Sequence, residues 1–78
     1  MEQSNIETPD GQRWYFTYHA KQRMRLYRLS YDEAKELLFH GSAEYAYTDP
    51  NVYKVYNKRV EMVVNVKLNK IITIYIRT

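Results

Sequence analysis

The chain has 78 residues, with twelve Lys and Arg against nine Asp and Glu, and it contains no cysteine. A chain of this length forms one small domain that buries only about 60–65% of its unfolded surface, and without cysteine it has neither a disulfide nor a thiolate site. No apolar run approaches the roughly 20 residues of a membrane span. Residues 1–12 contain three acids and no apolar stretch, so we do not expect them to be a signal peptide. We therefore expect a cytoplasmic protein with no membrane partner.

The charges fall in blocks along the chain. Residues 13–28 hold five basic residues and no acid, and residues 50–78 hold six basic residues against one acid. Residues 29–49 are net acidic. Such a polarised surface favours a polyanion such as nucleic acid, or an acidic protein partner. Ordinary solubilising charge is the alternative explanation.

The first part of the chain predicts a tail, a strand and a helix. Residues 1–12 are polar and aperiodic, so we expect a flexible tail ahead of a single domain over residues 13–78. Residues 13–18 are aromatic and predict a strand with one face formed by Trp14, Phe16 and Tyr18. Residues 19–28 have helical spacing, with a buried face formed by Ala20, Met24 and Tyr27.

A second helix has the clearest start signal in the sequence. Ser30 and Glu33 have the spacing of a capping box, in which each side chain bonds the backbone N–H of the other residue. The helix should run to about His40, with Gly41 in the left-handed position beyond its end. Its outward residues are acidic, which makes it a poor surface for nucleic acid.

From residue 42 the hydrophobic period changes to two, which predicts four strands with turns between them. Asn57 should turn one hairpin by adopting a positive φ. The strands cover residues 43–48, 52–56, 59–68 and 71–77. The core faces of the last two should be formed by Val60, Met62, Val64, Val66, Leu68, Ile72, Ile74 and Ile76, with Ile71 outward.

The predicted fold class is α+β. Its element order is β-α-α-β-β-β-β, with the two N-terminal helices packed on one face of a mainly antiparallel sheet.

The sequence lacks the motifs of several enzyme classes. It has two glycines, so it contains no Gly-rich loop for phosphate, and it shows no Cys or His spacing typical of a metal site. We therefore expect no cofactor and no metal ion. Metal-independent RNA cleavage remains, which needs a base, an acid and cations around the phosphate. Histidine is the side chain that titrates in the right range, and Arg23 lies one helical turn from His19, although a histidine at a helix start can equally bond its own backbone.

The chain also resembles a known family. The residues that carry the resemblance are His19-Ala-Lys-Gln-Arg23-Met24, then Arg28, the Ser30–Glu33 box, Gly41 and the closing Ile74-Tyr75-Ile76. This pattern, over about residues 15–77, resembles the small DUF4258 family. That family is similar in turn to BrnT, to RelE/ParE-type toxins and to colicin tRNases of the barnase–EndoU–colicin–RelE fold.

The resemblance implies an RNA-cleaving fold whose cleft is lined by the first helix and by polar strand residues. Only His19, Arg23 and Arg28 match the family motif. The candidate catalytic residues are His19, Arg23, Arg59 and Tyr75, and the candidate RNA-binding residues are Lys21, Arg25, Arg28, Lys54, Lys67 and Arg77.

The expected function is a small metal-independent ribonuclease of toxin type. It would cleave mRNA or tRNA and would be neutralised by a cognate antitoxin or immunity protein. One alternative is a non-catalytic phage or mobile-element module that binds nucleic acid or protein on the same fold. Another is an interaction protein that forms a homodimer through exposed strand edges.

Overall fold

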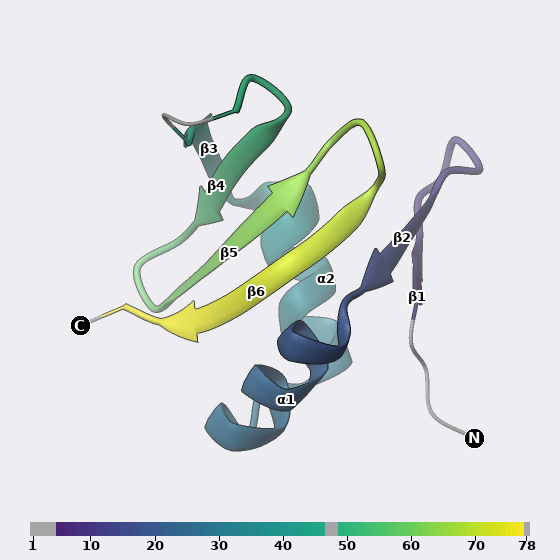
Figure 1. Cartoon of the computed structure of the whole chain (residues 1–78). Coiled ribbons are helices and arrows are strands. Elements are labelled where there is room, and N and C mark those ends of the chain that lie inside the picture. The colour runs from purple at the N-terminus through teal and green to yellow at the C-terminus, as the bar shows by residue number, and fades with distance from the viewer. Residues whose placement is uncertain (1–4, 47–48, 78) are drawn as a thin grey trace.

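A computed structural model describes residues 5–46 and 49–77, which form a six-stranded sheet with two helices packed on it (Figure 1). The strand order across the sheet is β1-β2-β6-β5-β4-β3, and every neighbouring pair is antiparallel except β2 and β6, which are parallel. The elements are β1 (Asn5–Glu7), β2 (Arg13–Phe16), α1 (Tyr18–Tyr27), α2 (Tyr31–His40), β3 (Ser42–Tyr45), β4 (Val52–Tyr56), β5 (Val60–Asn65) and β6 (Lys70–Ile76). The predicted α+β class and the order from β2 onward are confirmed.

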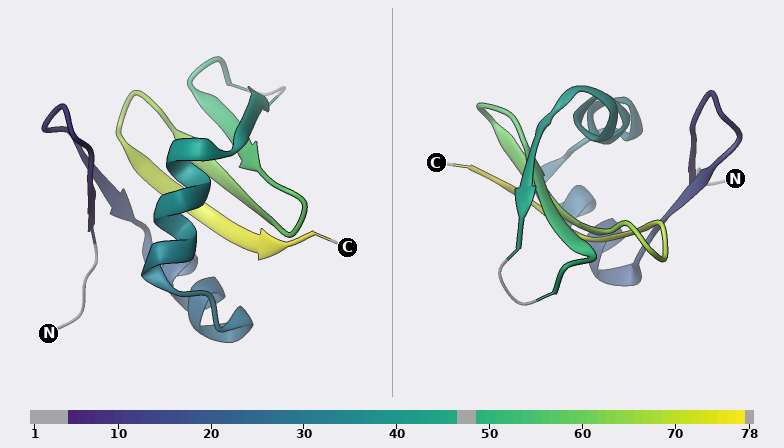
Figure 2. Two further views of the ribbon diagram at one scale, coloured as in Figure 1. Left: turned by 180° about the vertical axis from the view of Figure 1, so that it is seen from behind. Right: turned by 90° about the horizontal axis from the view of Figure 1, so that it is seen from above.

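The sheet has one covered face and one open face. α2 lies across the first, as the view from behind shows (Figure 2), whereas no helix of the described residues crosses β4, β5 and β6 on the side turned to the viewer in Figure 1. We call this second side the open face. On this face, near the β4–β5 turn, the cross-strand partners Tyr56, Glu61 and Tyr75 form a row.

Residues 5–12 do not form the unstructured tail that we predicted. β1 pairs with β2, and Ile6 lies opposite Trp14 with its side chain fully buried. The hydroxyl of Tyr31 in α2 donates a hydrogen bond to the carbonyl of Asn5 over 2.5 Å. A strand of three residues with one apolar side chain has no period that sequence reasoning could detect.

α1 begins one residue earlier than predicted because Thr17 caps it. The Thr17 hydroxyl accepts a hydrogen bond from the Ala20 N–H over 3.1 Å and donates one to the carbonyl of Ile72 over 2.6 Å. Tyr18 is therefore in the helix and is 77% exposed, which corrects its predicted place in the strand. The pairing of β2 with β6 is limited to the start of β6, and α1 lies beside β6 beyond that point (Figure 1).

α1 ends in a left-handed residue that is not glycine. Arg28 has φ 56° and ψ 41°. Its N–H donates to the carbonyl of Arg25 over 3.3 Å, and the N–H of Leu29 donates to that of Met24 over 2.8 Å. These two bonds close the last turn as in a Schellman motif, and they turn the buried Leu29 into the core.

The predicted capping box of α2 is confirmed, but the predicted role of Gly41 is wrong. Glu33 N–H donates to the Ser30 hydroxyl over 3.1 Å, and Ser30 N–H donates to the Glu33 carboxylate over 3.3 Å. Gly41 has φ −70°, which any residue can adopt. Glycine is needed at this position because there is no room for a side chain: a Cβ would lie 2.6 Å from the Leu37 carbonyl oxygen and 2.9 Å from Val55 Cγ1.

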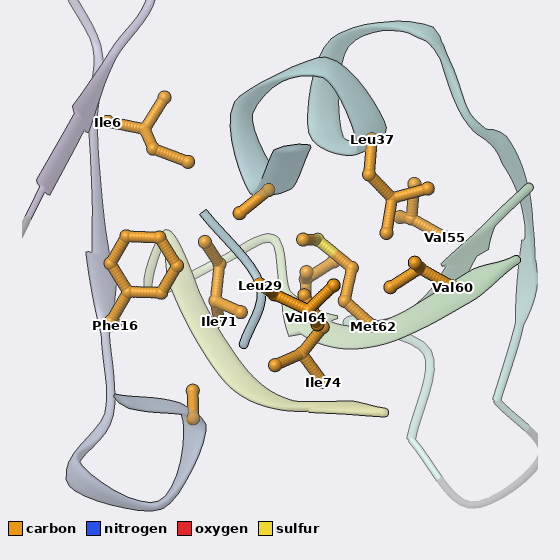
Figure 3. Close-up of a cluster of buried hydrophobic side chains, with 12 residues drawn as sticks. Ile6, Phe16, Leu29, Leu37, Val55, Val60, Met62, Val64, Ile71 and Ile74 are labelled. Carbon is orange, nitrogen blue, oxygen red and sulfur yellow. The ribbon is translucent and has the colours of Figure 1, made fainter. Parts of the chain in front are cut away.

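The core fills the space between α2 and the sheet (Figure 3). Trp14 and Phe16 contribute to it as predicted. Two predicted core residues, Val66 and Leu68, are 41% and 55% exposed because β5 ends at Asn65. The largest fully buried side chains are Ile6, Leu37, Met62, Val64, Ile71 and Ile74.

A bulge in β6 changes which isoleucines are buried. Val63 lies opposite Thr73 while Val64 lies opposite Ile71, so Ile72 is an extra residue in β6. Ile71 is fully buried and Ile72 is only partly buried, the reverse of the prediction. The extra residue breaks the two-residue period on which the prediction rested.

Hydrogen bonds to one side chain hold the turn between β4 and β5. The Asn57 side-chain oxygen accepts hydrogen bonds from the N–H groups of Arg59 and Val60, each over 2.8 Å. Asn57 does not have the predicted positive φ; Asn69, in the next hairpin, does, with φ 53°. β3 is shorter than predicted, and the end of its predicted range, residues 47–48, lies outside the described residues.

Candidate functional site

α1 is a basic element with a partly apolar outer surface. It contains Lys21, Arg23 and Arg25, has no acid, and is followed directly by Arg28. Tyr18 and Leu26 add large side chains that are 77% and 65% exposed. This combination of cations with an exposed ring suits a polyanion that also presents flat groups, such as single-stranded RNA.

The structure brings His19 and Arg23 together as predicted. The Arg23 Nε–H donates to His19 Nε2 over 3.4 Å. An imidazole nitrogen accepts a hydrogen bond through a lone pair, and a general base takes up a proton through the same lone pair. At 3.4 Å the bond is long, and a substrate hydroxyl can replace it.

The basic residues of α1 divide between its two sides. Ala20 is buried where the helix meets β6. At 100° per residue, His19 and Arg23 lie to one side of Ala20, and Lys21 and Arg25 lie to the other. The two pairs therefore lie on opposite sides of the face that α1 packs against β6.

Arg59 was predicted to act with His19, but its contacts are with α2. Its Nη1 lies 2.8 Å from Oε2 of Glu33, the carboxylate that also caps α2. Arg59 lines a hollow that also includes Asp32, Glu33 and Glu36 and that does not include His19. Three acids make this hollow unfavourable for a phosphate.

Tyr75 belongs to a hydrogen-bonded group on the open face. Its hydroxyl donates to Oε2 of Glu61, a residue that is only 9% exposed. This bond, together with burial, raises the pKa of Tyr75 to about 12. Tyr75 therefore remains a neutral phenol near pH 7 and can donate a proton but cannot act as a base.

Arg77 is held beside the same group. Its guanidinium carbon lies 4.5 Å from the centroid of the Tyr56 ring, and its Nη1 donates to the carbonyl of Asn57 over 3.2 Å. Its Nε lies 3.8 Å from Oε1 of Glu61. Glu61 is not among the predicted site residues, although its position as the lone acid among six bases in residues 50–78 was a signal.

The two remaining predicted residues differ in position. Lys54 lies on β4 opposite Glu44 of the edge strand β3 and two residues before Tyr56, so strand alternation places both on the open face. Lys67 is exposed in the turn between β5 and β6. The candidate residues therefore form an α1 group around His19 and Arg23 and an open-face group around Tyr75 and Arg77, with Lys54 on the same face and Arg59 and Lys67 outside both.

No family model, curated protein or solved structure matches this chain, so the resemblance to the DUF4258 family stays an expectation from its motif. Within residues 5–46 and 49–77, no three His, Cys, Asp or Glu side chains are grouped so that they could hold a metal ion. In the same part of the chain, neither helix has the length and apolar character needed to cross a membrane.

Proposed function

We propose that the domain is a small RNA-binding protein of the ribonuclease-toxin type, which holds RNA against α1 and cleaves it without a metal ion. The observation that carries this proposal is the 3.4 Å contact between Arg23 Nε and His19 Nε2 on a helix that has cations and no acid. The pair supplies two of the groups that the reaction needs, a base and a cation beside it.

In the proposed reaction, His19 Nε2 exchanges its bond with Arg23 for one with a ribose 2′-hydroxyl and takes its proton. The 2′-oxygen then attacks the adjacent phosphorus, and the bond to the 5′-oxygen breaks. Arg23 stabilises the negative charge that develops on the non-bridging oxygens. The leaving 5′-oxygen takes a proton from solvent, and the products are a 2′,3′-cyclic phosphate and a free 5′-hydroxyl.

Binding would use the outer surface of α1. Lys21 and Arg28 attract the phosphates, and the exposed ring of Tyr18 offers a surface on which a base can stack. The RNA would be an mRNA or a tRNA. A cognate antitoxin or immunity protein that inhibits the domain would need an acidic surface to cover this helix.

A second candidate function is RNA binding without cleavage. It is favoured by the contacts of Arg59 with Glu33 and of Tyr75 with Glu61. These contacts leave only His19 and Arg23, of the four predicted catalytic residues, to perform chemistry.

The test uses purified protein and end-labelled RNA in the presence of EDTA. We expect cleavage with a 2′,3′-cyclic phosphate product, and a loss of about 100-fold or more in rate for His19→Ala and for Arg23→Ala. Lys35→Ala, which removes a cation from α2, is the matched control and should keep the wild-type rate. Circular dichroism establishes that each variant is folded.

Three outcomes separate the candidates. Cleavage that survives both substitutions removes the proposed site. Intact RNA that is bound with an affinity that falls as salt is raised supports the binding function alone. Protein that neither cleaves nor binds any cellular RNA refutes both.

A further inference from the structure

A second group of cations surrounds a hollow away from α1. The hollow has a volume of about 300 Å³ and lies where the end of α2, the β4–β5 turn and the residue after β6 meet. Three basic side chains, one hydroxyl and one phenol line it: His40, Lys58, Arg77, Ser42 and Tyr56. None of the described residues that line it is acidic, in contrast to the neighbouring hollow beside Arg59.

The acids nearest to this group leave part of its charge uncompensated. Glu36 lies 3.8 Å from His40, and Glu61 lies 3.8 Å from Arg77, but neither lines the hollow. Lys58 has no ion-pair partner among the described residues. A dissolved anion would therefore meet at least one unpaired cation here.

Arg77 is already held in place for such a ligand. The Tyr56 ring, the Asn57 carbonyl and the Glu61 carboxylate each contact its guanidinium group. A side chain that is fixed before binding loses little conformational entropy when it binds. The planar guanidinium group matches two oxygens of a phosphate.

We propose that this hollow binds the phosphoryl group of a nucleotide, with Arg77 and Lys58 as its cationic ligands and Ser42 as a hydroxyl donor. A volume of about 300 Å³ lies at the lower end of the range for small-molecule sites, so it fits a phosphate with its sugar rather than a larger ligand. The phosphoryl group belongs either to a free mononucleotide or to the backbone of an RNA strand. The site does not depend on cleavage at His19.

The test is a titration followed by backbone-amide NMR, with three probes: inorganic phosphate, AMP and a short single-stranded RNA. We expect saturable shifts at Ser42, Asn57 and Lys58 for at least one probe. Lys58→Glu should weaken this binding about tenfold. Lys35→Glu makes the same change in net charge on a part of α2 that does not line the hollow, and it should weaken binding much less.

The arms of the titration identify the source of the phosphate. Binding of phosphate or AMP assigns the hollow to a free nucleotide, and binding of the oligonucleotide alone assigns it to an RNA backbone. Equal weakening by the two charge-reversing variants would show a general charge effect and overturn the proposal. Absence of saturable shifts around the hollow with all three probes would overturn it as well.

Discussion

Arg28 occupies a backbone conformation that favours glycine, and its replacement tests what the arginine contributes. At φ 56° and ψ 41° its Cβ is crowded by the neighbouring carbonyl oxygen. The Schellman bonds from Arg28 and Leu29 fix this conformation at the end of α1. We predict that Arg28→Gly is more stable than Arg28→Ala, while both variants lose the same cation.

The magnitude follows from three contributions. Removing the crowded Cβ stabilises the folded state by about 1–2 kcal/mol. The greater conformational freedom of glycine in the unfolded chain offsets about 0.4–1 kcal/mol of this gain. Arg28→Gly should therefore be more stable than Arg28→Ala by about 1 kcal/mol in free energy of unfolding, which is about 4–8 °C in Tm for a domain of this size. Against wild type the gain is smaller, because a cation at the helix C-terminus contributes about 0.3–1 kcal/mol.

Thermal and urea denaturation measure these differences in stability, and an RNA-binding assay measures what the charge of Arg28 contributes to binding. Equal stabilities of Arg28→Gly and Arg28→Ala would refute the assignment of strain to this residue. If Arg28 contacts phosphate as proposed, both variants should bind RNA more weakly and with a smaller salt dependence. The chain would then retain a strained arginine because that position needs a charge.

Two further predictions concern buried hydrogen bonds. Tyr75→Phe should lower the free energy of unfolding by about 1–3 kcal/mol, because the nearly buried Glu61 carboxylate loses a hydrogen-bond donor. Tyr15→Phe, on the exposed side of β2, should leave the free energy of unfolding almost unchanged. The folded-state pKa of Tyr75 is raised to about 12 from a value near 10, so its stabilising effect is full below pH 10 and is lost as the pH rises toward 12. Urea denaturation across this range should show a steeper decline in stability for wild type than for Tyr75→Phe. Parallel curves would contradict the bond between Tyr75 and Glu61. Thr17→Val should lower the free energy of unfolding by about 1–2 kcal/mol, because it removes the cap on the Ala20 N–H and the bond that holds α1 to β6. Thr17→Ser keeps the hydroxyl, so an equal loss of stability in both variants would argue against this explanation.

The helices and the central strands were predictable because their signals are local. The Ser30–Glu33 box marks the start of α2 within four residues, and β4 has the predicted bounds Val52–Tyr56. The errors arose where a distant residue decides the local structure. β1 exists because β2 and Tyr31 supply its partners, and the bulge at Ile72 lies where Thr17 bonds its carbonyl.

The candidate site was predictable only within one element. Helical spacing placed His19 next to Arg23, and the structure agrees. Strand spacing could not show that Arg59 reaches Glu33 on α2, or that Glu61 lies between Tyr75 and Arg77. Such contacts depend on the strand order and on the direction in which the turns carry their side chains.

The position of β6 has a consequence for how the domain is made. This strand is the last element of the chain, yet it lies between β2 and β5 in the middle of the sheet. The bond between Thr17 and Ile72 spans 55 residues of sequence. A growing chain on the ribosome therefore holds β2 and β5 without their common partner until translation passes Lys70. The domain should remain unfolded during most of its synthesis and complete its sheet only after the last strand emerges.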